Sequence, residues 1–390
     1  MFFFPSHFRS LAVSLLLTAA VGSARQAPEP IHSPEVGSDR RVTFRLNAPN
    51  AQKVEVHLEG RKEPIALQKN EKGIWSGTTQ PLAPDYYGYS LTVDGVRELD
   101  PSNSSIIPNL LNPSNSLHIS DTTAMPWEAS DIPHGAVHHH FYRSSIIGDN
   151  RDFYVYTPPG YDPSASILYP ALYLCHGFSD DASGWTAVGK ANYILDTLIA
   201  QNKAKPMIIV MALGYGAPEI LQASTGGFRS PGLRERNFNN FRNALIDEVM
   251  PRVERTYKVS PNRESRAIAG LSMGGAESLF TGLNRMDLFS YVGSFSAGGL
   301  GEDLNIALPQ ISATANSQLH LLWIACGTED ALITNNRKTV AYLKDKGITL
   351  TQIETPGMHT WMVWRRNLIE FTPLLFRSGS TGTASATSVR

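Results

Sequence analysis

The chain has 390 residues, a length that predicts about two domains plus termini. It carries 34 Lys and Arg against 35 Asp and Glu, a formal net charge of −1, so no overall field attracts nucleic acid or anionic lipid. A hydrophobic share of 42% with 18% charged residues excludes wholesale disorder and a protein with many membrane spans. We therefore expect a globular protein with no nucleic-acid partner.

The first 24 residues have the features of a secretion signal. Arg9 precedes an apolar run from Leu11 to Val21 that is too short to cross a bilayer. Small residues follow, as a signal peptidase requires, so we expect cleavage near Ala24. An uncleaved membrane anchor is the alternative. The signal peptide predicts a secreted or periplasmic protein with no membrane span after cleavage.

Two further segments are predicted to lack packed structure. Residues 25–40 are rich in Pro and polar side chains and cannot bury enough apolar surface, so we expect a linker there. Residues 378–390 are small and polar, and we expect a disordered tail.

Residues 41–125 have the pattern of a small all-β sandwich. Apolar and polar side chains alternate with period two in Val42–Leu46, Val54–Leu58 and Tyr87–Val93. Turn residues separate these runs, and the Asp94–Gly95 pair predicts a tight hairpin. The region is therefore predicted to form an antiparallel sandwich.

Residues 126–377 have the pattern of an α/β domain, because buried strands alternate with amphipathic helices. The predicted strands are Arg151–Tyr156, Tyr169–Cys175, Met207–Met211, Arg266–Ala269, Tyr291–Phe295, Leu319–Ala325 and Thr349–Glu354. The predicted helices are Tyr193–Ala200, Asn239–Tyr257, a helix from near Gly275, Arg337–Lys346 and Trp361–Phe371. The alternation predicts a mostly parallel sheet with helices on both faces.

The motif Gly270–Gly275, GLSMGG, lies between a predicted strand and a predicted helix. A G-x-S-x-G sequence in this position is typical of a nucleophile elbow, a tight turn that exposes a serine hydroxyl at the carboxyl edge of a sheet. Its glycines are needed because a turn this tight leaves no room for neighbouring side chains. Ser272 is therefore the candidate nucleophile.

A serine nucleophile needs a general base and an acid that follow it in the chain. Of the two later histidines, His320 opens a strand at the amino edge, whereas His359 follows the last strand at the carboxyl edge, so we predict His359 as the base. Glu329 and Asp330 both follow a strand at that edge, and only one of two adjacent acids can reach the imidazole. The sequence favours Asp330.

The tetrahedral intermediate requires two preorganised N–H donors. We expect one from Met273, the residue after the nucleophile, and the other from Phe178, which follows a buried strand and a His-Gly pair. His176 precedes the serine in the chain, so we expect it to position this loop. The aromatic side chains of Trp185 and Trp361 are candidates for stacking on an aryl or sugar group of the substrate.

A metal site is not predicted. Strand alternation places His138 and His140 on one face, but no Cys, Asp or Glu completes a ligand set. We also expect no cofactor.

Residues 133–377 resemble the esterase D-like branch of the α/β-hydrolases, and most closely carbohydrate esterase family one, which holds feruloyl and acetyl xylan esterases. The motifs that carry the resemblance are VYTPPGY at Val155–Tyr161, LYLCHG at Leu172–Gly177, the elbow itself, CGTED at Cys326–Asp330, and GMHTW at Gly357–Trp361. The resemblance implies the triad Ser272, Asp330 and His359, with Asp330 in place of Glu329. Many relatives have His-Asp-Trp where this chain has His359–Thr360–Trp361.

The first domain resembles the immunoglobulin-like β-sandwich that precedes glycogen-branching enzymes, of the carbohydrate-binding module family forty-eight type. Tyr86–Tyr89, Val93–Gly95 and Asp100–Pro101 carry this resemblance. It implies either glycan binding or a docking role. The resemblance to the hydrolases places two strands between Cys175 and Cys326, so we predict two free buried thiols.

Together the two resemblances imply an exported serine ester hydrolase that removes feruloyl or acetyl groups from xylan through an acyl-enzyme. Its expected partner is a polysaccharide or oligosaccharide ester. A siderophore-lactone esterase and a sugar acyltransferase are alternatives that use the same triad. A non-catalytic glycan-binding protein on a hydrolase fold is the third possibility, since a fold does not by itself define a function.

Overall fold

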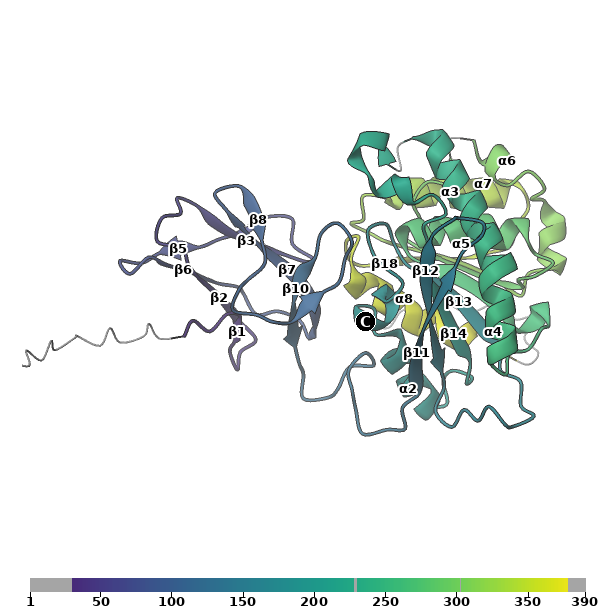
Figure 1. Ribbon diagram of the computed structural model, residues 1–390, viewed down its shortest axis with the longest axis horizontal. Helices are drawn as coiled ribbons and strands as arrows, with labels where there is room; N and C mark the ends of the chain where they lie inside the picture. Colours follow the sequence, from purple (N-terminus) through teal and green to yellow (C-terminus); the bar gives the residue numbers. More distant parts are fainter. Residues whose placement is uncertain (1–29, 228–229, 302, 378–390) are drawn as a thin grey trace, which may run out of the picture. The chain divides into compact units, whose positions relative to one another are not determined.

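The computed structural model describes residues 30–227, 230–301 and 303–377 (Figure 1). The predicted signal peptide at 1–24, the first part of the predicted linker, and the predicted tail at 378–390 lie outside these described residues. From His32 onward, the all-β part and the α/β part belong to one compact unit.

The N-terminal part is a sandwich of two antiparallel sheets, with strand orders β1-β2-β6-β5 and β4-β3-β7-β10-β9, and β8 paired to β7. Alternate side chains of the two sheets, among them Phe44, Val56, Trp75 and Tyr89, form one buried core. This arrangement agrees with the predicted sandwich. The strands are β1 (Glu35–Val36), β2 (Val42–Asn47), β3 (Val54–Leu58), β4 (Ile65–Ala66), β5 (Gln68–Lys69), β6 (Ile74–Thr78), β7 (Asp85–Val93), β8 (Val96–Glu98), β9 (Ile106–Ile107) and β10 (Ser114–Ile119).

The described end of the predicted linker is ordered, in contrast to the expectation that structure begins near Arg41. Strand β1 pairs with β2. The Ser33 hydroxyl donates to Asp100 at 2.7 Å and accepts the backbone N–H of Arg45 at 3.0 Å. Composition did not reveal this order because polar hydrogen bonds, rather than buried apolar side chains, hold the segment.

The α/β part is built on one eight-stranded sheet with the order β11-β12-β14-β13-β15-β16-β17-β18. Strand β12 pairs antiparallel with both of its neighbours, β11 and β14, and the remaining pairings are parallel. The predicted mostly parallel sheet is therefore confirmed. The strands are β11 (Ala136–Arg143), β12 (Asn150–Thr157), β13 (Ala171–Cys175), β14 (Ile208–Ala212), β15 (Arg266–Gly270), β16 (Tyr291–Phe295), β17 (Leu321–Gly327) and β18 (Thr351–Thr355).

Helices cover both faces of this sheet (Figure 1). Helices α3, α4, α5 and α7 pack into one hydrophobic core, and α2 and α8 pack into the other. The α-helices are α1 (Gly184–Ala187), α2 (Ala191–Ala200), α3 (Pro231–Ala244), α4 (Met250–Thr256), α5 (Ser272–Asn284), α6 (Leu304–Ala307), α7 (Ile333–Asp345) and α8 (Trp361–Phe371). Short 3-10 helices occupy Pro218–Leu221, Ala223–Thr225, Arg263–Ser265, Ala313–Ser317 and Thr372–Leu374.

Four of the five predicted helices begin earlier than expected: α2 at Ala191, α7 at Ile333, and the two helices described next. The helix expected over Asn239–Tyr257 begins at Pro231 and contains a π-helical segment, Leu245–Val249. Pro251 explains this segment, because proline has no N–H and its ring clashes with the carbonyl four residues earlier. Helix α5 begins at Ser272 itself, so the serine lies on the first helical turn.

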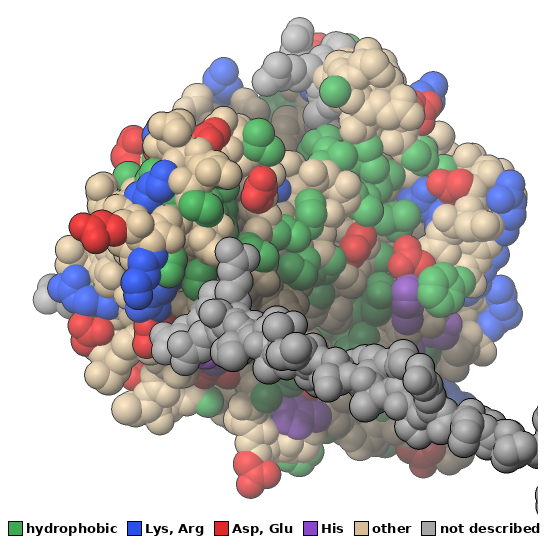
Figure 2. Space-filling model, turned by 60° about the vertical axis from the view of Figure 1, so that its left-hand side comes forward, with side chains coloured by type: hydrophobic (Ala, Val, Ile, Leu, Met, Phe, Trp, Pro, Cys, Tyr) green, Lys and Arg blue, Asp and Glu red, His purple; other side chains and the backbone are tan. Residues whose placement is uncertain are grey.

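Charges are mixed on the surface. On the face drawn in Figure 2, Lys and Arg side chains are interspersed with Asp and Glu side chains, as the net charge of −1 suggests. Within the described ranges, no helix has the length and apolar character that a membrane span requires.

The two cysteines are free and buried, as predicted. Cys175 ends β13 and Cys326 lies in β17, with β15 and β16 between these strands. Burial raises the pKa of both thiols, which keeps them in the unreactive protonated form.

We expect iodoacetamide to leave the folded protein unmodified and to alkylate both thiols in urea, with no mass change on reduction. Intact-protein mass spectrometry measures this, and labelling under native conditions would contradict it.

Candidate active site

Ser272 lies on a strained turn between β15 and α5. Its φ of +52° is in the left-handed region that non-glycine residues rarely adopt. The two flanking glycines allow the turn: a Cβ on Gly274 would meet the Cys175 carbonyl oxygen at 2.5 Å, and one on Gly270 would meet the Gly274 carbonyl oxygen at 2.5 Å. The backbone N–H of Gly298 donates to the Ser272 carbonyl at 2.9 Å and fixes the turn from the next loop. The local sequence thus produces the expected elbow.

Ser272, His359 and Asp330 form a hydrogen-bonded chain. The Ser272 Oγ lies 3.0 Å from His359 Nε2, and His359 Nδ1 lies 2.8 Å from Asp330 Oδ2. This spacing suits a tautomer in which Nδ1–H donates to the carboxylate and Nε2 accepts the serine proton. The His359 side chain is 34% exposed, whereas that of Asp330 is fully buried. The three loops that carry these groups meet at the carboxyl edge of the sheet.

The structure brings Asp330, rather than Glu329, to the imidazole. Glu329 is exposed, while the second carboxylate oxygen of Asp330 accepts the Leu332 backbone N–H at 2.8 Å. Burial raises the pKa of Asp330, but the hydrogen bond and charge of His359 and the Leu332 N–H outweigh it and hold that pKa below its usual value. Asp330 is therefore ionised and can stabilise an imidazolium. His320 pairs with Glu264 near the start of β17, at the opposite edge.

The candidate oxyanion donors Phe178 and Met273 border the serine. Met273 is the second residue of α5, and N–H groups in the first turn of a helix have no partner within the helix. A Cβ on Gly177 would lie 3.4 Å from the Ser272 Cβ, so the Gly177–Phe178 peptide runs directly beside the nucleophile. The Phe178 side chain packs on the small core that contains Met273 and Tyr215.

His176 orients the peptide that carries the Phe178 N–H. Its Nε2 accepts the Gly214 N–H at 2.8 Å, so Nδ1 holds the proton and donates to the Gly177 carbonyl at 2.8 Å. In a trans peptide the N–H of the next residue points away from that carbonyl. Burial lowers the pKa of His176 to about 4, so the ring stays neutral and keeps this tautomer. The predicted positioning role thus has a geometric basis.

Trp185 and Trp361 were candidates for stacking on substrate, and the structure corrects this expectation. Trp185 is 0% exposed, and its indole N–H donates to the Cys175 carbonyl at 2.8 Å. Trp361 is 8% exposed and packs edge-on against Trp185 at 5.3 Å between ring centroids. Both side chains fill the core between α8 and the sheet, where burial of a large aromatic ring is most favourable.

The three histidines of β11 have partners of their own. His139 contacts Asp152 at 2.7 Å, His140 contacts the Tyr257 hydroxyl at 2.5 Å, and His138 lies 3.3 Å from the Thr157 hydroxyl. Among the residues that the structure describes, no group of three or more His, Cys, Asp or Glu side chains is arranged to hold a metal ion.

Sequence reasoning missed four residues that surround the site. Asp180 lies two residues after Phe178 and is 6% exposed, and Tyr215 donates to its carbonyl at 2.7 Å. Asn109 and Glu59 come from the sandwich and bind the loops of Phe178 and His359. No local pattern could have identified them, because these contacts join residues that are far apart in the chain.

The arrangement can perform acyl transfer. It combines an exposed hydroxyl, a base within hydrogen-bond distance, a buried carboxylate that orients the base, and two candidate N–H donors for an oxyanion.

Family comparisons assign both parts of the chain. Residues 144–375 match the model of the esterase family, described as "Putative esterase". Residues 32–106 match carbohydrate-binding module 48, the isoamylase N-terminal domain.

Two curated proteins are similar in sequence. An endo-1,4-β-xylanase/feruloyl esterase from Xylanibacter ruminicola is 31% identical over 351 residues, which are 88% of this chain and 46% of that protein. The chain thus spans less than half the length of this relative. An acetyl esterase from Caldicellulosiruptor saccharolyticus is 21% identical over 230 residues, which are 50% of this chain and 79% of that protein.

Solved structures share the fold. A ferulic acid esterase of carbohydrate esterase family one from Anaeromyces mucronatus, in complex with ferulic acid, has a TM-score of 0.56 at 26% identity and covers 67% of this chain and 98% of that chain. The enterobactin esterase of Shigella flexneri, solved with enterobactin, has a TM-score of 0.63 at 18% identity and covers 85% of this chain and 92% of that chain. These findings confirm the expected α/β-hydrolase fold behind a small sandwich, and the expected resemblance to carbohydrate esterase family one.

Proposed function

The chain belongs to the esterase family, and from this premise we propose that it hydrolyses carboxylic esters with Ser272 as nucleophile, His359 as general base and Asp330 as the acid that orients it. The observation that carries this proposal is the imidazole of His359, which bridges the Ser272 hydroxyl and the Asp330 carboxylate on a nucleophile elbow.

In the proposed reaction, His359 Nε2 takes the Ser272 proton as Oγ attacks the ester carbonyl carbon. The Phe178 and Met273 N–H groups stabilise the resulting oxyanion. The tetrahedral intermediate then collapses: His359 gives its proton to the leaving oxygen, the ester C–O bond breaks, and the acyl group stays on Ser272. A water molecule, deprotonated by His359, attacks the acyl-enzyme and releases the carboxylic acid.

For the substrate, we propose a feruloyl or acetyl ester on xylan. The Xylanibacter relative is a xylanase/feruloyl esterase, the Anaeromyces structure is a ferulic acid esterase, and the Caldicellulosiruptor relative is an acetyl esterase. The sandwich, which matches a carbohydrate-binding module, is consistent with a polysaccharide substrate.

We further propose that residues 1–24 direct export, so that the enzyme meets the polysaccharide outside the cytoplasm, and that residues 41–125 and 126–377 are its two domains. The leader sequence supports the first proposal. The separate cores of the sandwich and the α/β part support the second.

A lactone of the enterobactin type is the second candidate substrate. The likeness to the enterobactin esterase extends over 85% of this chain, the sandwich included, and it concerns the fold alone. An α/β-hydrolase fold with a triad does not select the leaving group.

The test is a substrate panel with the purified protein: feruloylated arabinoxylan, methyl ferulate, acetylated xylan and enterobactin, each with Ser272→Ala as the control. We expect release of ferulate or acetate that depends on Ser272, measured by liquid chromatography. If the protein cleaves enterobactin and none of the other substrates, its substrate is a lactone and not a xylan ester. Products that the Ser272→Ala variant forms equally well would overturn the proposed nucleophile.

A further inference from the structure

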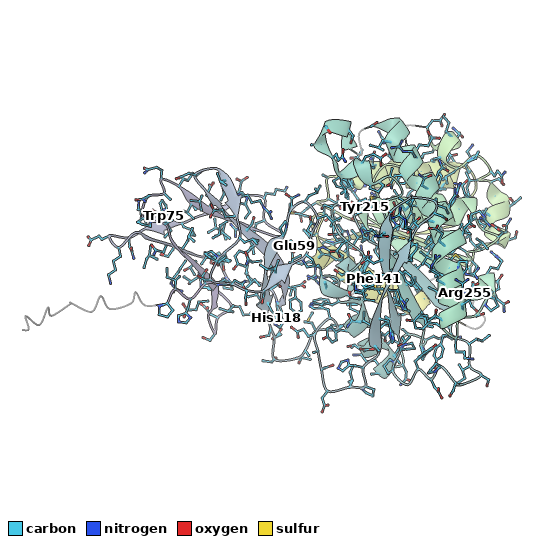
Figure 3. The ribbon with its side chains drawn as sticks, viewed as in Figure 1. Glu59, Trp75, His118, Phe141, Tyr215 and Arg255 are labelled. Atoms are coloured by element: carbon cyan, nitrogen blue, oxygen red, sulfur yellow. The ribbon has the colours of Figure 1, made fainter. Side chains whose placement is uncertain are left out.

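The sandwich contacts the two loops that carry the proposed oxyanion donor and the proposed base. Asn109, between β9 and β10, binds the turn Gly177–Asp180. Glu59, which directly follows β3 and is labelled in Figure 3, binds the first residue of α8, two residues after His359. The catalytic loops are therefore held partly by residues of the other domain.

Asn109 and its neighbour Leu110 bind the turn Gly177–Asp180 through three hydrogen bonds. Its Nδ2 donates to Ser179 Oγ at 3.0 Å and to Asp180 Oδ1 at 3.2 Å, and the neighbouring Leu110 N–H donates to the Ser179 carbonyl at 2.7 Å. Its Oδ1 accepts the backbone N–H groups of Leu111 and Asn112 at 3.1 and 2.8 Å, which fixes the orientation of the amide. The donor is thus preorganised toward the turn.

The turn needs this support because its backbone is strained. Ser179 has a φ of +70°, a left-handed conformation that is unfavourable for a non-glycine residue and persists only where the surrounding structure holds it. The Asp180 carboxylate in turn accepts the Gly177 N–H at 3.3 Å. Asp180 therefore links Asn109 of the sandwich to the backbone of Gly177, the residue before Phe178. Burial raises the pKa of Asp180 to about 7, while the Gly177 N–H and the Asn109 amide lower it.

Glu59 caps the N-terminus of α8, which has no capping side chain of its own. Thr360 occupies the N-cap position, but its side chain makes no capping hydrogen bond. Instead, Glu59 Oε1 accepts the Trp361 N–H at 2.8 Å, and Oε2 accepts the Gly88 N–H at 2.8 Å within the sandwich. A carboxylate at this end of an eleven-residue helix is also favoured by the helix dipole. This contact fixes the backbone directly after the His359 loop.

We propose that Asn109 and Glu59 are positioning residues for ester hydrolysis: the sandwich completes the active site by fixing the Phe178 and His359 loops. This inference rests on the proposed function. It gives the sandwich a role in the chemical step that is independent of any glycan binding.

The test uses p-nitrophenyl acetate, a substrate without a sugar, so that glycan binding cannot influence the result. We expect Asn109→Asp, which removes the amide donor and places a second carboxyl group beside Asp180, to lower kcat by about ten- to a hundredfold with KM changed less than twofold. Asn109→Ala removes the donor without adding charge and is expected to lose about tenfold. Inhibition by phenylboronic acid, which forms a tetrahedral adduct with the serine, should weaken by the same factors.

For the second contact we expect Glu59→Gln, which keeps the shape of the side chain, to lower kcat by about tenfold. Adding Thr360→Asp to this variant places a carboxylate at the N-cap of α8 and should restore most of the lost kcat, whereas it should not rescue Asn109→Ala. A general loss of stability would not be repaired by this one cap.

Matched controls make the same chemical changes nearby. Asn112→Asp alters an exposed side chain in the Asn109 loop, and Glu55→Gln alters a carboxylate on β3, so both should keep the parent kcat. If the Asn109 and Glu59 variants keep kcat within twofold, or if only their KM changes, the positioning role is wrong. If Ser272→Ala itself retains hydrolysis, the proposed function fails instead.

Discussion

Asp330→Asn is expected to lower kcat by about four orders of magnitude while KM stays nearly unchanged. The buried carboxylate accepts the His359 Nδ1–H at 2.8 Å and holds the tautomer whose Nε2 faces Ser272. An asparagine can present its amide N–H to Nδ1, which favours the opposite tautomer and leaves Nε2 protonated and unable to act as a base. Steady-state kinetics on p-nitrophenyl acetate measures the loss.

Glu329→Gln is the matched control, because it makes the same chemical change at the exposed neighbour of Asp330. We expect it to keep the parent kcat. A loss below tenfold in Asp330→Asn, or an equal loss in both variants, would remove Asp330 from its proposed role.

The pH dependence of the Asp330 contribution has a defined sign. The folded-state pKa of Asp330 lies below its usual value, so the hydrogen bonds of its carboxylate add stability above the pKa of the unfolded chain. That stability is lost as the pH falls through the lower, folded-state pKa. In neutral solution the carboxylate is ionised, and Asp330→Asn should therefore reduce kcat at every pH from about 6 to 8.

The second large effect concerns the ion pair between the domains. Asp85 of β7 and Arg365 of α8 are both fully buried, with Arg365 Nη2 at 2.7 Å and Nε at 3.1 Å from Asp85 Oδ1. Arg365 also donates to the carbonyls of Val188 and Tyr86 at 2.9 and 2.7 Å. Asp85→Ala leaves a buried guanidinium without its carboxylate, and we expect a loss of about 3–5 kcal/mol in the free energy of unfolding. Guanidinium chloride denaturation followed by fluorescence measures it.

An exposed pair of similar geometry provides the control. Arg337 and Glu354 form two hydrogen bonds at 2.8 and 2.7 Å, but their side chains are 57% and 30% exposed. Glu354→Ala should therefore cost about 1 kcal/mol or less. The double variant Asp85→Leu with Arg365→Met should be more stable than Asp85→Ala, because no buried guanidinium is left without its carboxylate. Arg366, which also contacts Asp85 at 3.1 Å, is 40% exposed and stays solvated. Equal losses in Asp85→Ala and Glu354→Ala would show that burial does not decide the effect.

Local pattern in the sequence determined most of the architecture and pointed to the proposed reactive groups. Period-two alternation marked the sandwich strands such as β2 and β3, and buried runs such as β13 and β14 marked the parallel sheet. The motif around Ser272 specified the elbow, because only glycine fits where the turn approaches the end of β13. Chain order and position after a strand identified His359, since strands of a parallel sheet bring their following loops to one edge.

Only the tertiary structure decided which side chains surround these groups. It buried Trp185 and Trp361 in the core and joined Asn109 to Asp180 and Glu59 to Trp361, contacts that span 71 and 302 positions of the chain. Such contacts leave no local signal, because a hydrogen bond between distant residues depends on how the two domains pack and not on the spacing of neighbouring residues. The sequence therefore identified the proposed reactive groups, and the packing of the sandwich on the loops that carry them determined what holds these groups in place.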